Sequence, residues 1–231
     1  MRQTKEKDYQ VDAGSSVGNV TFTDVSEQYA QLALQGPKAL DILRKLTKEE
    51  WIPQKYYHAV FDAEVAGTPC IVSKTGYTGE DGVELYLASG YAAQMWNALL
   101  EAGKEEGLIP CGLGARDTLR MEAAMPLYGH EMNEEISSGS GTYLCGETGK
   151  RGLHRKKALE EAGEPKRERI GLKVTGRGII REEQTVICAG EEIGTTTSGT
   201  HSPIPGIPDR HGACARPVSS TWGQSRSNVR G

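Results

Sequence analysis

The segment from Lys74 to Glu84, Lys-Thr-Gly-Tyr-Thr-Gly-Glu-Asp-Gly-Val-Glu, is the densest group of polar residues that could do chemistry. Its three glycines are typical of two reverse turns, and that structural interpretation stays open. Reverse turns do not account for the Tyr77 ring and the Glu84 carboxylate in this segment. Glu84 alternates with Val83 and Leu85, so it points to the opposite face of a strand. There a carboxylate can accept two N–H bonds from a planar heterocycle, on which a tyrosine ring can stack.

A second segment, Gly112-Leu-Gly-Ala-Arg-Asp-Thr-Leu-Arg-Met-Glu122, begins with two closely spaced glycines. It is not a dinucleotide-binding fingerprint, because the third glycine would fall at Asp117 and no buried strand precedes it. As the start of a helix it is sensible, since Asp117 and Thr118 favour a first turn. Arg116 then serves a ligand carboxylate or pairs with Asp117 or Glu122, and the residues alone leave these alternatives open.

Other reactive side chains form no readable site. The cysteines include no Cys-x-x-Cys pair and lie near no His-x-x-x-His motif, so the sequence supports no metal site. We interpret them as free thiols: Cys70, Cys111, Cys145, Cys188 and Cys214. His130 and Glu131 are adjacent but face different ways on any regular element, which makes them poor acid–base partners.

Length and charge narrow the classes of protein. The chain has 231 residues, enough for one large domain or two modest ones. Lysine and arginine total 27, aspartate and glutamate total 31, and the net charge is −4. This excludes nucleic-acid binders that rely on a strongly basic surface. No apolar run approaches the roughly 18 residues of a membrane helix, and the polar N-terminus is unlike a secretory signal. We expect a cytoplasmic protein with no membrane partner.

Hydrophobic periodicity predicts an α/β unit in the first part of the chain. We expect strands at 20–22, 30–34, 57–65, 70–73 and 83–87, and helices opening at 36–37, covering 91–102 and covering 117–123. A turn at Ala66-Gly67 joins two of these strands. Strand–helix–strand–strand–helix is the order of a split βαβ, ferredoxin-like unit with an antiparallel sheet.

The pattern changes after Ile136. Residues 137–157 contain five glycines, five lysines or arginines and one acidic residue, and no element is readable there. Short strands at 170–174, 185–188 and 193–197 are typical of a small β-barrel. We therefore expect a first domain at 1–136, an anomalous linker at 137–165 and a β-barrel domain at 166–231. Its tail after residue 203 is too poor in apolar residues to fold.

Several long motifs, taken in order, closely resemble those of aminomethyltransferases, the T-proteins of the glycine cleavage system. In the first part they are Leu34–Ala39, Lys74–Glu84, Gly112–Leu127 and the Tyr128–Glu131 that follows; in the second they are Gly176–Ile179 and Thr197–Pro203. They extend over residues 20–203 with a gap at 137–157. Motifs of this length in a shared order are specific.

The resemblance implies a reaction. Such enzymes take the aminomethyl group carried on the lipoyl arm of the H-protein, release ammonia and pass the one-carbon unit to tetrahydrofolate. It also implies that Tyr77, Glu84 and Arg116 bind the folate. Glu84 would face the paired N–H groups of the pterin, and Arg116 would steer or bind an anionic part of the ligand. The implied architecture is a ferredoxin-like folate-binding domain followed by a β-barrel domain.

The departures from the family matter as well. The family's N-terminal part, with an aspartate thought to assist the chemistry, has no counterpart here, and Lys5–Asp8 resembles the region just beyond it. We therefore expect a truncated, impaired enzyme whose catalytic aspartate lies upstream. Ala124 stands where glycine is common. The alternatives are a non-catalytic folate-binding remnant and the folate domain of a sarcosine or dimethylglycine oxidoreductase relative. The lack of a flavin fingerprint argues against the second.

Two stretches that fit nothing, 144–155 and the tail after Ile207, are expected to be translated out of frame. With permitted codons, Leu144–Arg155 reads Phe-Val-Ala-Lys-Leu-Glu-Lys-Glu-Asp-Phe-Ile-Gly one base later, which resembles the family's linker. Pro208–Ala215 reads Pro-Ile-Gly-Met-Ala-Leu-Val in the same shifted frame. The alternative is a divergent linker and tail. The nucleotide sequence of the gene distinguishes the two.

Overall fold

The computed structural model describes residues 2–15, 18–134, 136, 161, 168–174, 178–201, 203, 210–215 and 228–230. The chain divides into two compact units. The first contains Met1–Gly76 and Glu80–Pro110, and the second contains Tyr77–Gly79 and Cys111–Gly231.

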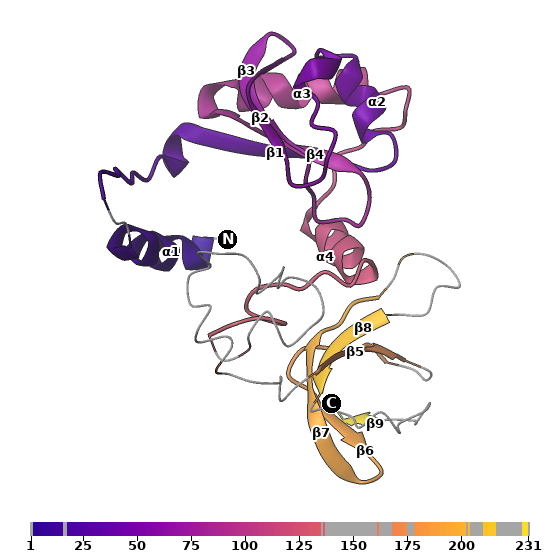
Figure 1. Ribbon diagram of the computed structural model, residues 1–231. Helices are drawn as coiled ribbons and strands as arrows, with labels where there is room; N and C mark the ends of the chain where they lie inside the picture. Colours follow the sequence, from indigo (N-terminus) through magenta and orange to yellow (C-terminus); the bar gives the residue numbers. More distant parts are fainter. Residues whose placement is uncertain are drawn as a thin grey trace. The chain divides into compact units, whose positions relative to one another are not determined.

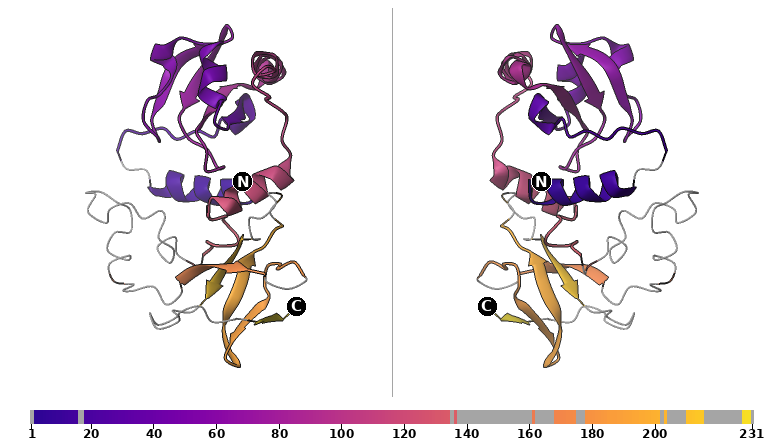
Figure 2. Two further views of the ribbon diagram at one scale, coloured as in Figure 1. Left: turned by 90° about the vertical axis from the view of Figure 1, so that its right-hand side faces the viewer. Right: turned by 90° about the vertical axis from the view of Figure 1, so that its left-hand side faces the viewer.

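The first unit is built on a four-stranded antiparallel sheet (Figure 1). Its strands are β1 (Tyr29–Gln35), β2 (Ala59–Val65), β3 (Thr68–Ser73) and β4 (Gly82–Ala88), in the spatial order β1-β4-β3-β2. Helices α2 (Ala39–Arg44) and α3 (Ala92–Ala102) pack on one face of the sheet, as the turned views in Figure 2 also show. The predicted α/β class with an antiparallel sheet is confirmed.

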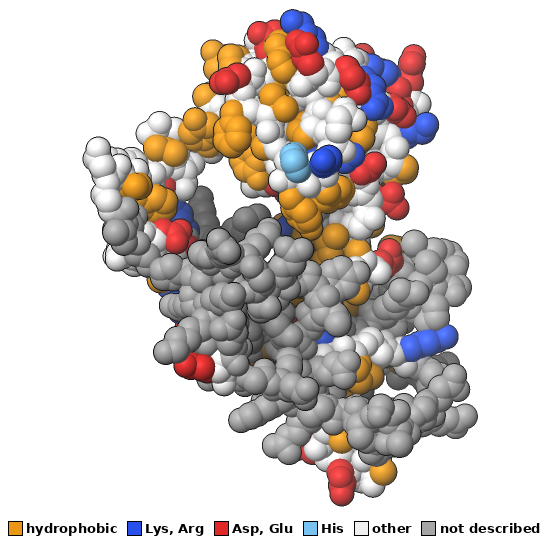
Figure 3. All heavy atoms as spheres, viewed as in Figure 1, with side chains coloured by type: hydrophobic (Ala, Val, Ile, Leu, Met, Phe, Trp, Pro, Cys, Tyr) orange, Lys and Arg blue, Asp and Glu red, His pale blue; other side chains and the backbone are white. Residues whose placement is uncertain are grey.

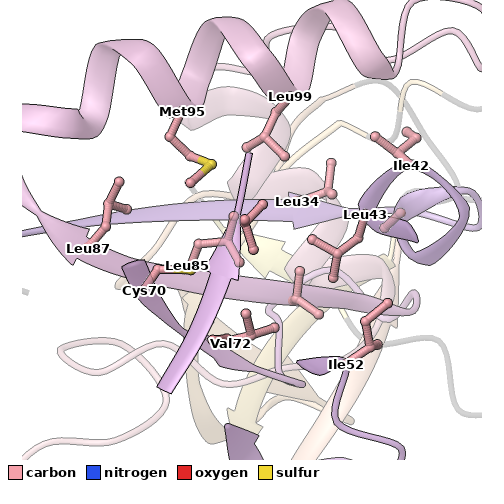
Figure 4. Close-up of a cluster of buried hydrophobic side chains, with 14 residues drawn as sticks. Leu34, Ile42, Leu43, Ile52, Cys70, Val72, Leu85, Leu87, Met95 and Leu99 are labelled. Carbon is pink, nitrogen blue, oxygen red and sulfur yellow. The ribbon is translucent and has the colours of Figure 1, made fainter. Parts of the chain in front are cut away.

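The core of this unit lies between the sheet and the two helices (Figure 4). Val83, Leu85 and Leu87 of β4 are fully buried, as their alternation predicts. Leu43 of α2 and Met95 of α3 close over them. Burying each such side chain stabilises the fold by about 1.5–3 kcal/mol. This packing commits alternate residues of β4 to the opposite face, where Glu84 lies.

The turn between β2 and β3 forms where the sequence predicts it. Ala66 and Gly67 both have positive φ, at 49° and 74°. A two-residue hairpin turn with two positive φ angles matches the right-handed twist of the strands that it joins. The predicted strand boundaries here are off by only two residues at each strand's start.

Two local predictions for the first unit need correction, and helices form there that were not predicted. No strand forms at 20–22, where Val20 and Phe22 are exposed and Phe22 stacks on Tyr9 of α1 (Arg2–Ser15), a helix that was not predicted. Alternation alone does not make a strand without a neighbour that takes its backbone hydrogen bonds. Helix α2 begins at Ala39 rather than Pro37. Short 3-10 helices precede β1, β2 and α3, at Ser26–Gln28, Glu49–Trp51 and Ser89–Tyr91.

The second unit contains helix α4 (Leu113–Glu122) and a five-stranded antiparallel sheet. Its strands are β5 (Glu168–Lys173), β6 (Thr185–Cys188), β7 (Glu191–Ser198), β8 (Arg210–Ala215) and β9 (Asn228–Arg230), in the order β5-β8-β7-β6-β9. This sheet lies within residues 166–231, for which a β-barrel domain is predicted. Helix α4 begins four residues before the predicted start.

The tail after residue 203 was expected to lack regular structure, and here the structure differs. Strand β8 pairs with β5 on one side and β7 on the other, and β9 pairs with β6. Backbone pairing between two neighbours supplies hydrogen bonds whatever the side chains are. The proposed out-of-frame segment 144–155 lies outside the described residues, as do Ile207 and most of the tail.

The described surface is mixed in charge. Figure 3 shows acidic and basic side chains interspersed over the helices of the first unit, where Arg44 of α2 pairs with Asp41 and Glu49. In the part of the chain that the structure describes, none of the helices has both the length and the apolar composition of a membrane span.

Candidate functional site

The loop between β3 and β4 carries Tyr77 and depends on a glycine. Gly79 has φ +81°, and a Cβ at this position would lie 2.7 Å from the Cβ of Ala123. Only glycine therefore lets the loop approach the end of α4 this closely. The hydroxyl of Tyr77 donates a hydrogen bond to the carbonyl oxygen of Pro126. The ring is thus held against the segment that follows α4.

Arg116 meets this ring from α4. Its guanidinium carbon lies 4.4 Å from the centroid of the Tyr77 ring, a cation–π contact that contributes about 0.5–1 kcal/mol at an exposed site. Of the alternatives that the sequence left open, pairing with Asp117 does not occur, because Asp117 pairs with Arg120. Within the described part of the chain, Arg116 forms no ion pair with a carboxylate. Its N–H groups are therefore available to an anionic ligand.

Arg120 lies one turn after Arg116 on α4 and is buried, with 3% of its surface exposed. Its Nε and Nη2 donate to Oδ1 of Asp117 at 2.8 and 2.6 Å. Its Nη1 donates to Oε2 of Glu131 at 3.1 Å, and Nη2 donates to Oγ of Ser198 at 3.0 Å. Glu131 Oε2 also accepts the backbone N–H of Leu127 at 2.9 Å. The cluster fixes the backbone on which Tyr77 rests.

The surroundings of Tyr77 keep its hydroxyl protonated. Burial raises the pKa of this phenol, and the carboxylates of Glu131 and Asp117 add to the rise, while Arg120 and Arg116 act against it. A phenol with a raised pKa stays a hydrogen-bond donor near neutral pH. Tyr77 thus contributes a ring surface in a fixed position and does not act as an acid or a base.

His130 and Glu131 do not act together, as predicted. Glu131 turns inward to Arg120, whereas His130 Nδ1 lies 3.0 Å from the carbonyl oxygen of Thr197 and 3.0 Å from Oε2 of Glu182. The two side chains serve different neighbours. His130 and Glu131 therefore do not form an acid–base pair with each other.

Glu84 lies on β4 of the first unit, on the face opposite the helices. Its half-buried carboxylate accepts a hydrogen bond from the hydroxyl of Tyr86, with 2.6 Å between Oε2 and the phenol oxygen. Among the described residues no donor reaches Oε1. The strand alternation predicted the face on which this carboxylate lies, and the structure confirms that face.

The structure brings Tyr77 and Arg116 into contact within the second unit and places Glu84 on the sheet of the first. Sequence reasoning missed Tyr86 and Arg120. The alternation that places Glu84 also places Tyr86 on the same face, so that signal was present. The spacing of three between Asp117 and Arg120 on a helix was another. Among the described residues, no group of histidine, cysteine and acidic side chains could hold a metal ion.

The sequence and the fold of this chain are similar to those of known proteins. Residues 2–140 match the model of the GCVT N-terminal domain. The chain belongs to this family. An aminomethyltransferase of Moorella thermoacetica is 43% identical over 231 residues, covering 98% of this chain and 63% of that protein. An aminomethyltransferase of Bacillus cereus strain AH187 is 46% identical over 203 residues, covering 86% of this chain and 55% of its own length.

A solved member of the family has the same fold. The crystal structure of glycine cleavage system aminomethyltransferase T from Bartonella henselae superposes with a TM-score of 0.66 at 29% identity. The superposed region covers 81% of the present chain and 52% of the Bartonella henselae chain. The present chain thus spans between half and two thirds of the length of these relatives.

Proposed function

We propose that the chain acts as an aminomethyltransferase of the glycine cleavage system. In this reaction the one-carbon unit passes from the aminomethyl group on the lipoyl arm of the H-protein to tetrahydrofolate, and ammonia is released. The 43% identity with the Moorella thermoacetica aminomethyltransferase supports the proposal, since that match covers 98% of the chain. The H-protein partner, the folate acceptor and a cytoplasmic location all stay part of the proposal.

The observation that carries the folate assignment is the carboxylate of Glu84. The aminopyrimidinone ring of a pterin presents two N–H groups on one edge, and a carboxylate can accept both in parallel. Glu84 stands on a rigid strand whose other face is fully packed, and its Oε1 accepts no hydrogen bond from a described residue. We assign it as the acceptor of these N–H groups.

Arg116 and Tyr77 supply the second element. Folates carry a carboxylate-bearing tail, and a guanidinium that forms no ion pair within the described residues is the natural partner for such an anion. The Tyr77 ring restricts the guanidinium by stacking under it at 4.4 Å. We assign Arg116 to the anionic part of the ligand and Tyr77 to its orientation.

The purified chain tests the proposal in two measurements: calorimetry with tetrahydrofolate, and ammonia release from aminomethyl-loaded H-protein in the presence of tetrahydrofolate. Turnover supports the transferase. Binding of folate without turnover, in an assay where the Moorella thermoacetica enzyme is active, supports the alternative of a non-catalytic folate-binding remnant. A chain that neither binds folate nor releases ammonia contradicts both.

A further inference from the structure

The sheet face opposite α2 and α3 carries, beside Glu84, a tyrosine that the proposed function does not use. Side chains two residues apart on a strand share a face, so Tyr86 lies on the same side of β4 as Glu84. The register sets Gln31 of β1 and Ile71 of β3 opposite Tyr86. No residue of this group contributes to the core on the other side.

The hydroxyl of Tyr86 is committed to Glu84. It donates to Oε2 at 2.6 Å, a distance typical of an O–H bond to an ionised carboxylate. The amide of Gln31 lies 3.5 Å from the same phenol oxygen, at the outer limit of a hydrogen bond. Burial, and then the bond to Glu84, raises the pKa of Tyr86 to about 12. The phenol is therefore a permanent donor near neutral pH.

This bond orders the carboxylate without occupying it. A glutamate has three side-chain torsions, and fixing a long side chain of this kind costs about 1.5–2 kcal/mol of rotamer entropy. Each carboxylate oxygen has two lone pairs. Tyr86 takes one of the four, which leaves Oε1 and the second lone pair of Oε2 of Glu84 for a pair of ligand N–H groups.

We propose that Tyr86 is a positioning residue, whose hydroxyl holds the Glu84 carboxylate in the orientation that accepts the two N–H groups of an aminopyrimidinone ring. The inference rests on the proposed function, in which Glu84 contacts the folate. The competing interpretation is that Tyr86 merely stabilises the sheet. The two differ in one respect: a positioning role depends on which donors the ligand has, and a structural role does not.

The test compares Tyr86→Phe with Tyr29→Phe. Tyr29 lies on the same face of the sheet, on β1, and within the described residues its hydroxyl makes no hydrogen bond. Calorimetry measures tetrahydrofolate and its 2-desamino analogue, which lacks one of the paired donors. We expect Tyr86→Phe to weaken tetrahydrofolate binding about tenfold and to leave binding of the analogue within about twofold. Tyr29→Phe should leave both within about twofold.

A double substitution tests whether the effect of Tyr86→Phe on tetrahydrofolate binding depends on Glu84. In a Glu84→Gln background, the additional Tyr86→Phe change should not weaken tetrahydrofolate binding further, because the group that it positions is already lost. Equal weakening for both ligands, a full additional loss in the Glu84→Gln background, or unchanged or tighter tetrahydrofolate binding would overturn the positioning role.

A spectroscopic measurement separates this proposal from the folate assignment. The alkaline absorbance titration of the parent minus that of Tyr86→Phe should isolate one tyrosine that ionises near pH 12. If this signal is present but the parent binds no tetrahydrofolate, the folate assignment fails and the positioning role falls with it. If the parent binds tetrahydrofolate but the signal lies near pH 10, the ordinary value for tyrosine, Tyr86 is neither buried nor bound to Glu84 in solution, and only the positioning role is overturned.

Discussion

The guanidinium of Arg116 lies over the ring of Tyr77, 4.4 Å from its centroid, while the hydroxyl of the same tyrosine is bound to the carbonyl oxygen of Pro126. Protein groups thus occupy one face of the ring and its only polar atom. The polar group of this pair that a ligand can reach is the guanidinium. In the proposed site Tyr77 therefore contributes by orienting Arg116, and its substitution should be interpreted in that way.

Glu84→Ala should weaken tetrahydrofolate binding more than Tyr77→Phe does. Removing the carboxylate leaves the paired N–H donors of the ligand without an acceptor, at a cost of about 1–3 kcal/mol. Tyr77→Phe keeps the stacking surface under Arg116 and loses only the bond to Pro126. Calorimetry on both variants measures the difference. Parent-like affinity in Glu84→Ala would contradict the site assignment.

Arg116→Ala should weaken folate binding and reduce its dependence on salt, because a hydrogen bond to a charged group contributes about 1.5–3 kcal/mol and the attraction between exposed charges is screened by ions. The matched control is Arg44→Ala, which removes an exposed arginine that pairs with Asp41 and Glu49 of the same unit. Titrations at low and high salt compare the two. An equal effect of both variants would show that Arg116 contributes only to the general charge.

Breaking the buried pair of Arg120 and Glu131 should be costly. Arg120→Met leaves the carboxylate of Glu131 buried, with the N–H of Leu127 as its one remaining donor among the described residues, and losing one partner of a buried pair costs about 3–5 kcal/mol. Arg44→Met removes two exposed pairs, with Asp41 and Glu49, each of which contributes no more than about 1 kcal/mol. Urea unfolding gives both values, and similar losses would mean that the Arg120 cluster does not stabilise the fold.

The thiol of Cys70 should make stability fall at alkaline pH. Burial raises the pKa of this thiol to about 11, from an ordinary value of 9.0. Below about pH 9 both folded and unfolded chains keep the proton and the contribution to stability is complete. Above it the unfolded chain ionises first, so the contribution is lost as the pH rises toward 11. Urea unfolding at pH 8 and pH 10 should show a smaller decline for Cys70→Ala, which has no thiol.

Alkylation checks the same burial. Cys111 is exposed and Cys70 is buried. Mass spectrometry after brief treatment with iodoacetamide at pH 8 should find Cys111 modified well before Cys70, because the thiolate is the reactive form. Equal rates would show that Cys70 is not buried in solution.

The sheet of the first unit could be predicted well because the alternation of apolar and polar residues that marks a strand lies within a few consecutive residues. The alternation of Val83, Leu85 and Leu87 determines which face of β4 is buried, and that in turn places Glu84 on the other face. The same alternation failed at Val20 and Phe22, since a strand also needs a neighbour for its backbone and the sequence does not say where one lies.

Short motifs in the sequence point to some residues of the candidate site but not to others. Tyr77 and Arg116 were chosen from motifs, and the structure brings them together. The hydrogen bond between Arg120 and Ser198 joins residues 78 positions apart, and no spacing rule connects them. Long-range contacts of buried polar groups depend on how complete elements pack, so only the structure shows them.

Ala124→Gly should stabilise the protein. Ala124 follows α4 with φ +56°, a left-handed conformation that costs a residue with a Cβ roughly 1–2 kcal/mol. Glycine removes this cost but adds about 0.5–1 kcal/mol of conformational entropy to the unfolded chain, so we expect a net gain of up to about 1 kcal/mol. The control is Ala93→Gly, at an exposed position within α3, which should lose about 0.5–1 kcal/mol. Urea midpoints measure both, and a loss at Ala124 as large as that at Ala93 would mean that the left-handed turn after α4 does not persist in solution.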